Sequence, residues 1–487
     1  MKLLKDILYK AGLLEVTGST NVAITSLTFD SRKVQKDGLF VALRGAKADG
    51  HDYIEDVASK GVVAIVCEEF PEIMLERVAY VKVKDSHIAL GIIASNFYDN
   101  PSSLLKLVGV TGTNGKTTSV TLLYNLFRSL GYKVGLISTV RNMVNAEEIQ
   151  STHTTPDPIS LNQMLARMIE TGCAYCFMEV SSHAVVQHRI SGLQFAGGVF
   201  TNITHDHLDY HKTFDDYIKA KKGFFDALEP EAFALVNRDD ANGAIMLQNC
   251  KAAKKYFSMR SMADFKCKVL ENQFSGLLLS IDGTEVWSKL IGSFNAYNLL
   301  GVYACATLLK QNKMNVLTTL STLNPVEGRF EYFRTESGIT GIVDYAHTPD
   351  ALQNVLKTIK DIRTGNEQVI TVVGCGGDRD SAKRPVMARI ACENSDKVIL
   401  TSDNPRTEQP EAIISQMQAG IETLYYKKTL SITDRKEAIR TACSLAQPGD
   451  IILLAGKGHE KYQEINGVKH PFDDLTILKE SLKQITQ

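Results

Sequence analysis

Apolar residues along the chain fall into short runs separated by polar turns, a pattern that predicts alternating strands and helices. Before about residue 100, the β-rich runs are residues 21–29, 39–43, 62–66 and 78–83. Leu4, Ile7 and Leu8 recur at helical spacing within residues 1–16. We therefore expect a small α/β domain first, with a boundary at the Asn100-Pro101 step.

The same alternation continues through two further segments. Strands and helices alternate from Ser102 to about Leu320, as in a parallel sheet that binds ligands at the carboxyl ends of its strands. A polar stretch, residues 324–331, indicates a hinge into a third α/β segment. The length of 487 residues suggests about three domains. We place these α/β domains at residues 1–100, 101–328 and 329–487.

Residues 108–118 (VGVTGTNGKTT) lead from an apolar strand into glycines, a lysine and two hydroxyls. Such a turn binds phosphate, because backbone N–H groups and the Lys116 ammonium meet the anion while the Thr117 hydroxyl ligates Mg²⁺. An amphipathic helix should follow. The common motif G-x-x-x-x-G-K-[ST] would need its first glycine at Val110, whereas this sequence offers Gly112. The alternative is an exposed Gly-Lys turn without a ligand.

The central segment contains further polar positions near predicted strand ends. Glu179 follows an apolar strand, where a P-loop enzyme places its second metal-site residue; a solvated glutamate is the alternative. Residues 201–211 (TNITHDHLDYH) predict a metal role, and the phosphate loop favours Mg²⁺ over zinc. Lys221 is by default a solvated surface lysine. Asn295 and Asn298 share one helix face, where one side chain can cap the helix and the other can recognise an adenine edge.

Four apolar strands of the third segment end in polar clusters. These clusters are residues 344–349 (DYAHTP), 374–380 (GCGGDRD), 403–406 (DNPR) and 456–460 (GKGHE). Parallel strands bring their carboxyl ends to one edge, so a binding cleft is favoured over four separate turns. Gly374 and Gly376 do not begin a dinucleotide fingerprint, because its third glycine would fall at Arg379. Near the start of the chain, residues 30–32 (DSR) form either a polar turn or a ligand contact.

The amino-acid composition limits the classes of function that this chain can have. The 54 basic and 55 acidic residues leave a formal net charge of -1, so overall charge favours neither nucleic acid nor an anionic membrane. The nine cysteines are odd in number and scattered, which fits free thiols in a reducing cytoplasm. Cys173 and Cys176 should point to opposite faces of a strand and pack there. The N-terminal residues are unlike a signal peptide, and no apolar run reaches membrane-spanning length.

Together these motifs resemble the Mur ligases of peptidoglycan synthesis. The resemblance rests on residues 111–118, the Glu179 strand end, the His207 cluster, the Asn295 and Asn298 pair, and residues 344–347. Within the family, residues 181–183, the His188-Arg189 pair and residues 403–406 are similar to the ligases that add the third residue to UDP-N-acetylmuramoyl-L-alanyl-D-glutamate. The match spans all three segments.

The resemblance implies a role for each domain. The N-terminal domain would bind the UDP-N-acetylmuramoyl substrate, the central P-loop domain would bind ATP on a parallel sheet, and the Rossmann-like C-terminal domain would bind an amino acid. ATP and Mg²⁺ are the implied cofactors. The other substrates are small molecules, namely UDP-N-acetylmuramoyl-L-alanyl-D-glutamate and meso-diaminopimelate, and we expect a cytoplasmic monomer.

Site residues carry over from the family position by position. ATP would be held by Gly112, Thr113, Asn114, Gly115, Lys116, Thr117, Thr118, Asn298, Arg329 and Asp344. The catalytic residues would be Lys116, Glu179, His207 and Lys221, and the metal ligands Thr117, Glu179, His207 and Lys221, the last if carbamoylated. Ser31, Thr154, Thr155, Ser182, Gln187 and Arg189 would hold the nucleotide-sugar dipeptide. Arg379, Asp403, Asn404, Arg406, Gly456 and Glu460 would hold meso-diaminopimelate.

The implied reaction converts the D-glutamyl γ-carboxylate into an acyl phosphate, which the incoming amine then attacks. Arg406, in a set that includes Glu408, would clamp the far carboxylate of meso-diaminopimelate, while Glu460 accepts its ammonium. Lysine lacks that carboxylate, so we expect discrimination of about a few kcal/mol. One stretch departs from the family pattern, because Ala46-Lys47 stands where some members read His-Gln.

Three alternatives remain at this point. The first is a ligase of the same kind that adds L-lysine. The second is a folylpolyglutamate-type ligase, which shares the phosphate loop but lacks the N-terminal domain and residues 403–406. The third, from another class, is a P-loop kinase or NTPase, which would use Lys116 and Thr117 without needing a third domain. A catalytically inactive binding protein is disfavoured by the complete set of metal-site residues.

Overall fold

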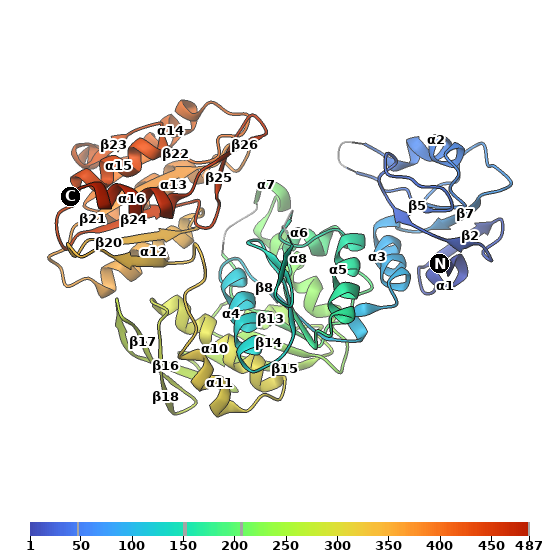
Figure 1. Cartoon of the computed structure of the whole chain (residues 1–487), viewed down its shortest axis with the longest axis horizontal. Coiled ribbons are helices and arrows are strands. Elements are labelled where there is room, and N and C mark those ends of the chain that lie inside the picture. The colour runs from blue at the N-terminus through green and yellow to red at the C-terminus, as the bar shows by residue number, and fades with distance from the viewer. Residues whose placement is uncertain (46–47, 150–152, 205–207, 486–487) are drawn as a thin grey trace.

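Three α/β bodies follow one another along the chain, with the central one lying between the other two (Figure 1). The computed structural model describes residues 1–45, 48–149, 153–204 and 208–485. Each body contains one main sheet of five, eleven or six strands. In the described residues, no helix has the length and apolar character needed to cross a membrane.

The first body contains a five-stranded sheet in the order β2-β7-β6-β5-β4. Its elements are β1 (Lys2–Leu3), α1 (Leu4–Ile7), β2 (Leu13–Thr17), β3 (Ala23–Ile24), β4 (Leu27–Thr28), β5 (Leu39–Val41), α2 (Ile54–Ser59), β6 (Ala64–Cys67), β7 (Ala79–Val83) and α3 (Ser86–Phe97). Strands β4 to β7 are parallel, and β2 joins β7 antiparallel. A core of Leu, Ile, Val and Ala side chains lies between this sheet and helices α1 and α3.

The structure sets the limits of two predicted elements of this body. Leu4 and Ile7 lie in α1, as their helical spacing predicts, and the chain leaves the helix before Lys10 and Gly12, which adopt positive φ angles of 59° and 71° ahead of β2. The β-rich run at residues 21–29 is two strands, of which β3 pairs with β1 and β4 with β5. Between them the Thr25 N–H donates to the Asp37 carbonyl and turns the chain from one sheet to the other.

The central sheet has the order β11-β10-β9-β12-β8-β13-β14-β15-β16-β17-β18. Its strands are β8 (Lys106–Thr111), β9 (Val134–Ile137), β10 (Asn142–Val144), β11 (Glu147–Ile149), β12 (Tyr175–Glu179), β13 (Gly197–Phe200), β14 (Phe233–Asn237), β15 (Ala253–Ser258), β16 (Phe265–Gln273), β17 (Gly276–Ile281) and β18 (Thr284–Ser288). Pairing is parallel from β9 across to β16, as predicted, and antiparallel at both margins.

Helices cover both faces of this sheet. They are α4 (Lys116–Ser129), α5 (Pro158–Glu170), α6 (Ser182–Val186), α7 (Leu208–His211), α8 (Phe214–Asp226), α9 (Gly243–Met246), α10 (Ser293–Leu308) and α11 (Lys313–Leu320). Side chains alternate along β8, so Val108 and Val110 join a core with α4, α10 and α11, whereas Leu107 joins one with α5 and α8. This packing holds the carboxyl end of β8 in the middle of the sheet.

The third body contains a six-stranded sheet in the order β19-β20-β24-β21-β22-β23. Its strands are β19 (Glu331–Arg334), β20 (Thr340–Asp344), β21 (Val369–Cys375), β22 (Lys397–Ser402), β23 (Thr429–Ser431) and β24 (Ile451–Ala455), with a separate hairpin of β25 (Tyr462–Ile465) and β26 (Val468–Pro471). Its helices are α12 (Pro349–Ile362), α13 (Lys383–Asn394), α14 (Pro410–Gln418), α15 (Arg435–Leu445) and α16 (Asp474–Ile485). All strands but β19 are parallel, so the four predicted polar clusters lie at one edge.

All nine cysteines are free and buried, as the sequence predicted. Cys173 and Cys176 do not lie on opposite faces, because Cys173 precedes the first residue of β12 and both thiols join one core. We keep residues 1–100, 101–328 and 329–487 as proposed domain limits.

A buried ion pair between helices α15 and α16 gives a prediction about stability. Arg435 and Asp474 are fully buried, with Nη2 2.6 Å from Oδ2, and Arg435 also donates to the Ala455 carbonyl. Arg435→Met leaves Asp474 charged and unpaired, so the unfolding free energy of this domain should fall by about 3–5 kcal/mol. The measurement is urea unfolding of the whole chain.

The matched control for that variant lies on the same helix. Arg440→Met removes a guanidinium that pairs with Glu437 at an exposed site, so its effect should stay within about 1 kcal/mol. Equal losses in Arg435→Met and Arg440→Met would contradict the role assigned to the buried pair.

Candidate active site

A glycine-rich loop connects β8 to α4 at the carboxyl edge of the central sheet. Gly115 precedes the helix with a φ of +85°, and a Cβ there would collide with the Asn298 side chain. A Cβ on Gly112 would collide with the Thr201 hydroxyl. The loop therefore requires glycine at both positions, and the order of strand, loop and helix is as the sequence predicted. Binding of an anion at the N-terminus of α4 stays a prediction.

Two lysines converge on this loop. Lys116 Nζ donates to the carbonyls of Gly112 and Thr113, each at 2.8 Å. Lys221 of α8 also donates to the Gly112 carbonyl, at 2.9 Å, and its ammonium lies 4.6 Å from the Tyr217 ring centroid. The default expectation of a solvated Lys221 is wrong, because its side chain is buried. Packing of α8 brings it to the site.

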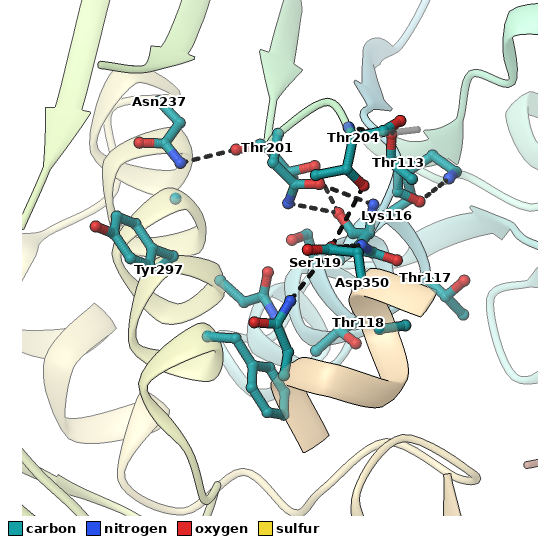
Figure 2. Close-up of a pocket in the computed structure, with 18 of the residues that line it drawn as sticks. Thr113, Lys116, Thr117, Thr118, Ser119, Thr201, Thr204, Asn237, Tyr297 and Asp350 are labelled. Carbon is teal, nitrogen blue, oxygen red and sulfur yellow. Dashed lines mark hydrogen bonds between the residues drawn. The ribbon is translucent and has the colours of Figure 1, made fainter. Parts of the chain in front are cut away.

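Polar residues that follow β13 form hydrogen bonds with the glycine-rich loop, and several of them are drawn in Figure 2. Asn114 N–H donates to Asn202 Oδ1, and the Asn114 carbonyl accepts from Thr201 Oγ1 at 2.7 Å. Asp350, at the start of α12, accepts from Asn114 Nδ2 at 2.8 Å and from Thr204 Oγ1 at 3.3 Å. The third body therefore reaches the phosphate loop through Asp350, which the sequence analysis did not identify.

Glu179 lies at the carboxyl end of β12 with its carboxylate held inside the protein. The Thr139 N–H and hydroxyl donate to it at 2.8 and 3.2 Å. Thr139 Oγ1 lies 3.0 Å from Thr154 Oγ1, and Thr155 Oγ1 donates to the Glu179 carbonyl at 2.8 Å. The residues proposed for metal and for substrate are thus joined by one hydrogen-bonded network.

The donor chemistry fits Mg²⁺. The Thr117 hydroxyl and the Glu179 carboxylate are hard oxygen donors, and both line the cavity at the phosphate loop. The described residues hold no group of three His, Cys, Asp or Glu suited to a metal ion. Mg²⁺ needs only one or two protein oxygens beside phosphates and water. His207 lies outside the described residues, so its predicted part in this site stays a prediction.

Arg329 and Asp344 bring the start of the third body to the same cavity. Arg329 Nη2 donates to Thr117 Oγ1 at 3.1 Å, and its guanidinium lies 4.5 Å from the Tyr345 ring centroid. Asp344 accepts from the Phe330 N–H at 2.6 Å. Burial raises the pKa of Asp344 to about 6, although Arg329 acts in the opposite direction. Asp344 is therefore a buried acceptor that takes up a proton at a higher pH than an ordinary aspartate does.

Asn298 is oriented by Asn295 within α10. Asn298 Nδ2 donates to Asn295 Oδ1 at 3.0 Å, and Asn295 Nδ2 donates to the Ile291 carbonyl at 2.8 Å. The capping interpretation for one asparagine is wrong, because Gly292 is the N-cap and no side chain caps the helix. Asn298 instead faces the phosphate loop at Gly115.

These groups line one cavity of about 490 Å³, which is a typical volume for a ligand pocket. Every predicted ATP residue except Gly112 lines it, together with Glu179, Lys221, Thr154 and Ser182. The lining of this cavity therefore comes from several strand ends and helices of the central body and from the start of the third body.

The other predicted substrate residues lie beside this cavity or farther away. Arg189 Nη1 donates to the Thr155 carbonyl at 2.7 Å, and its Nε and Nη2 donate to Gln187 Oε1. Ser182 Oγ lies 2.8 Å from His211 Nε2. Thr155, Gln187 and Arg189 line neither described cavity.

Ser31 is not brought to either cavity in the described structure. It lies in a turn of the first body, where Arg32 pairs with Asp30 at 2.9 Å and lowers the pKa of that carboxyl to about 2. The Arg32 guanidinium therefore stabilises this turn. Residues 46 and 47, where the sequence departs from the family pattern, lie outside the described residues.

A second cavity, of about 560 Å³, opens at the edge of the third sheet. All six residues predicted for meso-diaminopimelate line it, namely Arg379, Asp403, Asn404, Arg406, Gly456 and Glu460. They come from three of the four strand ends, and Tyr345 and His347 come from the fourth. Thr154, Tyr345 and His347 line both cavities, so the two sites adjoin.

Arg406 and Glu408 have separate roles at this edge. Arg406 Nη1 donates to the Gly377 carbonyl at 2.7 Å, and its Nε lies 3.5 Å from Glu464 Oε2. Glu408 does not line the cavity, which corrects the prediction that it helps to select the amino acid. It instead accepts two hydrogen bonds of 2.8 Å from Arg384.

Comparison with known proteins agrees with this arrangement. Family models match residues 23–98 (Mur ligase family, catalytic domain), 110–306 (Mur ligase middle domain) and 328–458 (Mur ligase, glutamate ligase domain). A curated relative from Cytophaga hutchinsonii is 60% identical over 480 residues, covering 98% of this chain and 99% of its own. One from Bacteroides fragilis is 57% identical over 477 residues, covering 98% of both. Both are named UDP-N-acetylmuramoyl-L-alanyl-D-glutamate--2,6-diaminopimelate ligase.

A solved structure extends the agreement to three dimensions. The structure of a UDP-N-acetylmuramoyl-L-alanyl-D-glutamate--2,6-diaminopimelate ligase is 30% identical, with a TM-score of 0.71, and covers 100% of this chain and 99% of its own. The three-body fold, the adjoining cavities and these relatives confirm the resemblance seen in the sequence. The chain belongs to the Mur ligase family.

Proposed function

We propose that this chain uses ATP to add meso-diaminopimelate to the D-glutamyl γ-carboxylate of UDP-N-acetylmuramoyl-L-alanyl-D-glutamate. The observation that carries this proposal is the meeting of two cavities at Thr154, Tyr345 and His347. One cavity is built around a phosphate loop, and the other is lined by charged groups of both signs. A ligase needs this adjacency, because the activated carboxyl group must meet an amine before water reaches it.

The reaction proceeds in two steps. A γ-carboxylate oxygen attacks the γ-phosphorus of ATP, the bond to the bridging oxygen breaks, and ADP leaves an acyl phosphate behind. The amine then attacks the acyl carbon, inorganic phosphate departs, and the amine loses a proton as the amide forms. Lys116 and the loop N–H groups offset the negative charge that keeps carboxylate and phosphate apart. Asn298, Arg329 and Asp344 are proposed to hold the nucleoside part of ATP.

Thr117 and Glu179 are the proposed holders of Mg²⁺, with His207 and a carbamoylated Lys221 serving a second ion. When bound, Mg²⁺ neutralises charge on the phosphates. Carbamoylation would turn the buried Lys221 ammonium into a carboxylate-like oxygen donor. Its place beside the Gly112 carbonyl supports this proposal.

The proposed substrate residues form two groups, one for the muramoyl dipeptide and one for the amino acid. Ser182, Thr154 and the network through Thr155, Gln187 and Arg189 are proposed to hold the muramoyl dipeptide, with Ser31 contacting its nucleotide end. In the second cavity Arg406 and Arg379 would take the far carboxylate of the amino acid. Asp403, Asn404, Gly456 and Glu460 would take its polar groups, with Glu460 accepting the ammonium.

One chain contributes the lining of both cavities, so we propose a monomer. Contacts of Asp350 and Arg329 with the phosphate loop support a third domain that closes over ATP and excludes water. The nine free thiols are in keeping with a cytoplasmic location.

The decisive experiment supplies the purified chain with ATP, Mg²⁺ and the UDP-muramoyl dipeptide, and measures phosphate release. We expect release with meso-diaminopimelate and not with L-lysine. Release with lysine would favour the lysine-adding alternative, and release with a folate substrate the folylpolyglutamate-type ligase. ATP turnover without the dipeptide would favour an NTPase.

A further inference from the structure

Lys457 is a fully buried lysine directly behind the amino-acid cavity. It follows β24 in the turn between Gly456 and Glu460, and its side chain has no solvent exposure. Its Nζ lies 2.8 Å from Asn404 Oδ1, 3.4 Å from Asp403 Oδ1 and 3.5 Å from Glu460 Oε2. Three oxygens therefore surround the three N–H groups of this ammonium, which could not be buried without such partners.

The first consequence concerns the orientation of Asn404. Lys457 Nζ and the Glu464 N–H both donate to Asn404 Oδ1, the latter at 3.0 Å. Donors can approach only the oxygen end of an amide, so the other end of Asn404 must be its NH₂ group. That group donates to Glu460 Oε2 at 2.7 Å. Lys457 and the Glu464 N–H thus together turn the NH₂ end of Asn404 toward Glu460.

The second consequence concerns charge. Asp403 and Glu460 are two carboxylates of the same cavity wall, and Lys457 lies between them. Burial raises the pKa of Glu460, repulsion from Asp403 adds to the increase, and Lys457 opposes both. Burial also opposes ionisation of Asp403, but Lys457 and Arg435 outweigh it and lower the pKa of that carboxyl. The ammonium therefore balances a pair of carboxylates that would otherwise repel each other.

We propose that Lys457 is a positioning residue for amino-acid recognition, which acts through Asn404 and Glu460 to build the ammonium-accepting end of the cavity. This inference rests on the proposed function. Lys457 is itself buried behind these residues and does not line the cavity, so its effect on the amino acid is indirect. Its loss should therefore weaken binding of meso-diaminopimelate while leaving ATP and the dipeptide unaffected.

The test is steady-state kinetics of Lys457→Met, which keeps an unbranched side chain shorter by one atom and removes its charge. The KM for meso-diaminopimelate should rise by about tenfold or more, while the KM values for ATP and the UDP-muramoyl dipeptide stay within about twofold. Lys436→Met, at an exposed position of α15, is the matched control and should change none of the three. An unchanged KM for meso-diaminopimelate in Lys457→Met would overturn the proposal.

A double-mutant cycle separates this role from a general loss of structure. Glu460→Gln should also raise the KM for meso-diaminopimelate, and Lys457→Met combined with Glu460→Gln should raise it by less than the two single effects combined, because Lys457 acts in part through Glu460. The double variant also removes one charge of each sign, so it tests the point if the single variant unfolds. Fully additive effects would overturn the proposal. Absence of phosphate release by the wild-type chain would instead refute the proposed function.

Discussion

Lys116→Ala is expected to lower tripeptide synthesis by about 10²- to 10³-fold, the loss typical of removing one group that stabilises charge in a transition state. Lys116 is the first residue of α4, and its ammonium lies within the phosphate loop on the Gly112 and Thr113 carbonyls. When ATP binds, this ammonium is expected to turn to the phosphates. Phosphate release from ATP in the presence of both other substrates measures the loss.

The loop itself should survive this substitution. Lys221 continues to donate to the Gly112 carbonyl, and Asn202 still binds the Asn114 N–H. Lys106→Ala is the matched control, because Lys106 begins the strand that leads into the same loop and its side chain is exposed. The control should retain activity within about twofold, as surface substitutions usually do. Wild-type synthesis by Lys116→Ala would refute the assignment of this loop to ATP.

Arg406→Ala is expected to abolish the preference for meso-diaminopimelate over L-lysine. The kcat/KM for meso-diaminopimelate should fall by about 10²-fold or more, which is the cost of losing a charge-assisted bidentate contact. The value for lysine should change much less, because lysine has no second carboxylate to pair with the guanidinium. Rates of phosphate release with each amino acid measure the ratio.

Backbone and side-chain contacts hold Arg406 in place. Its φ of 52° lies in the left-handed region, which is uncommon for a residue other than glycine, and its backbone N–H donates to the Glu464 carbonyl. Contacts with Gly377 and Glu464 orient the guanidinium from one side. Arg406→Lys keeps the charge without the planar fork and should give an intermediate preference. Arg389→Ala, at an exposed site of α13, is the control; unchanged selectivity in Arg406→Ala would contradict our account of the cavity.

Local sequence was sufficient for the phosphate loop and for the edge of the third sheet. Strand, glycines, Lys116 and helix are contiguous, so the loop could be recognised from neighbours in the chain, although distant residues such as Thr201 and Lys221 also hold it. The polar clusters after β20, β21, β22 and β24 could be placed together because parallel strands must end at one edge. Both predictions needed only the order of the elements.

Local spacing could show neither where a short helix ends nor which partner a nearby side chain takes. The helical spacing near the N-terminus did not reveal that Lys10 and Gly12 adopt positive φ and start a new strand. Glu408 looked like part of the selecting motif because it is close in sequence to Arg406. Its partner Arg384 comes from helix α13, and this pairing holds Glu408 outside the cavity lining.

The sequence by itself determined the α/β class, the phosphate loop, the polar edge of the third sheet and the family, because each is encoded in contiguous residues or in the order of elements. Only the tertiary structure decided that Lys221, 109 residues from Gly112, lies buried at the loop, that Asp350 and Arg329 reach it from the third body, and that Lys457 stands behind Glu460. These contacts depend on how helices and domains pack. Packing joins residues that no local pattern connects.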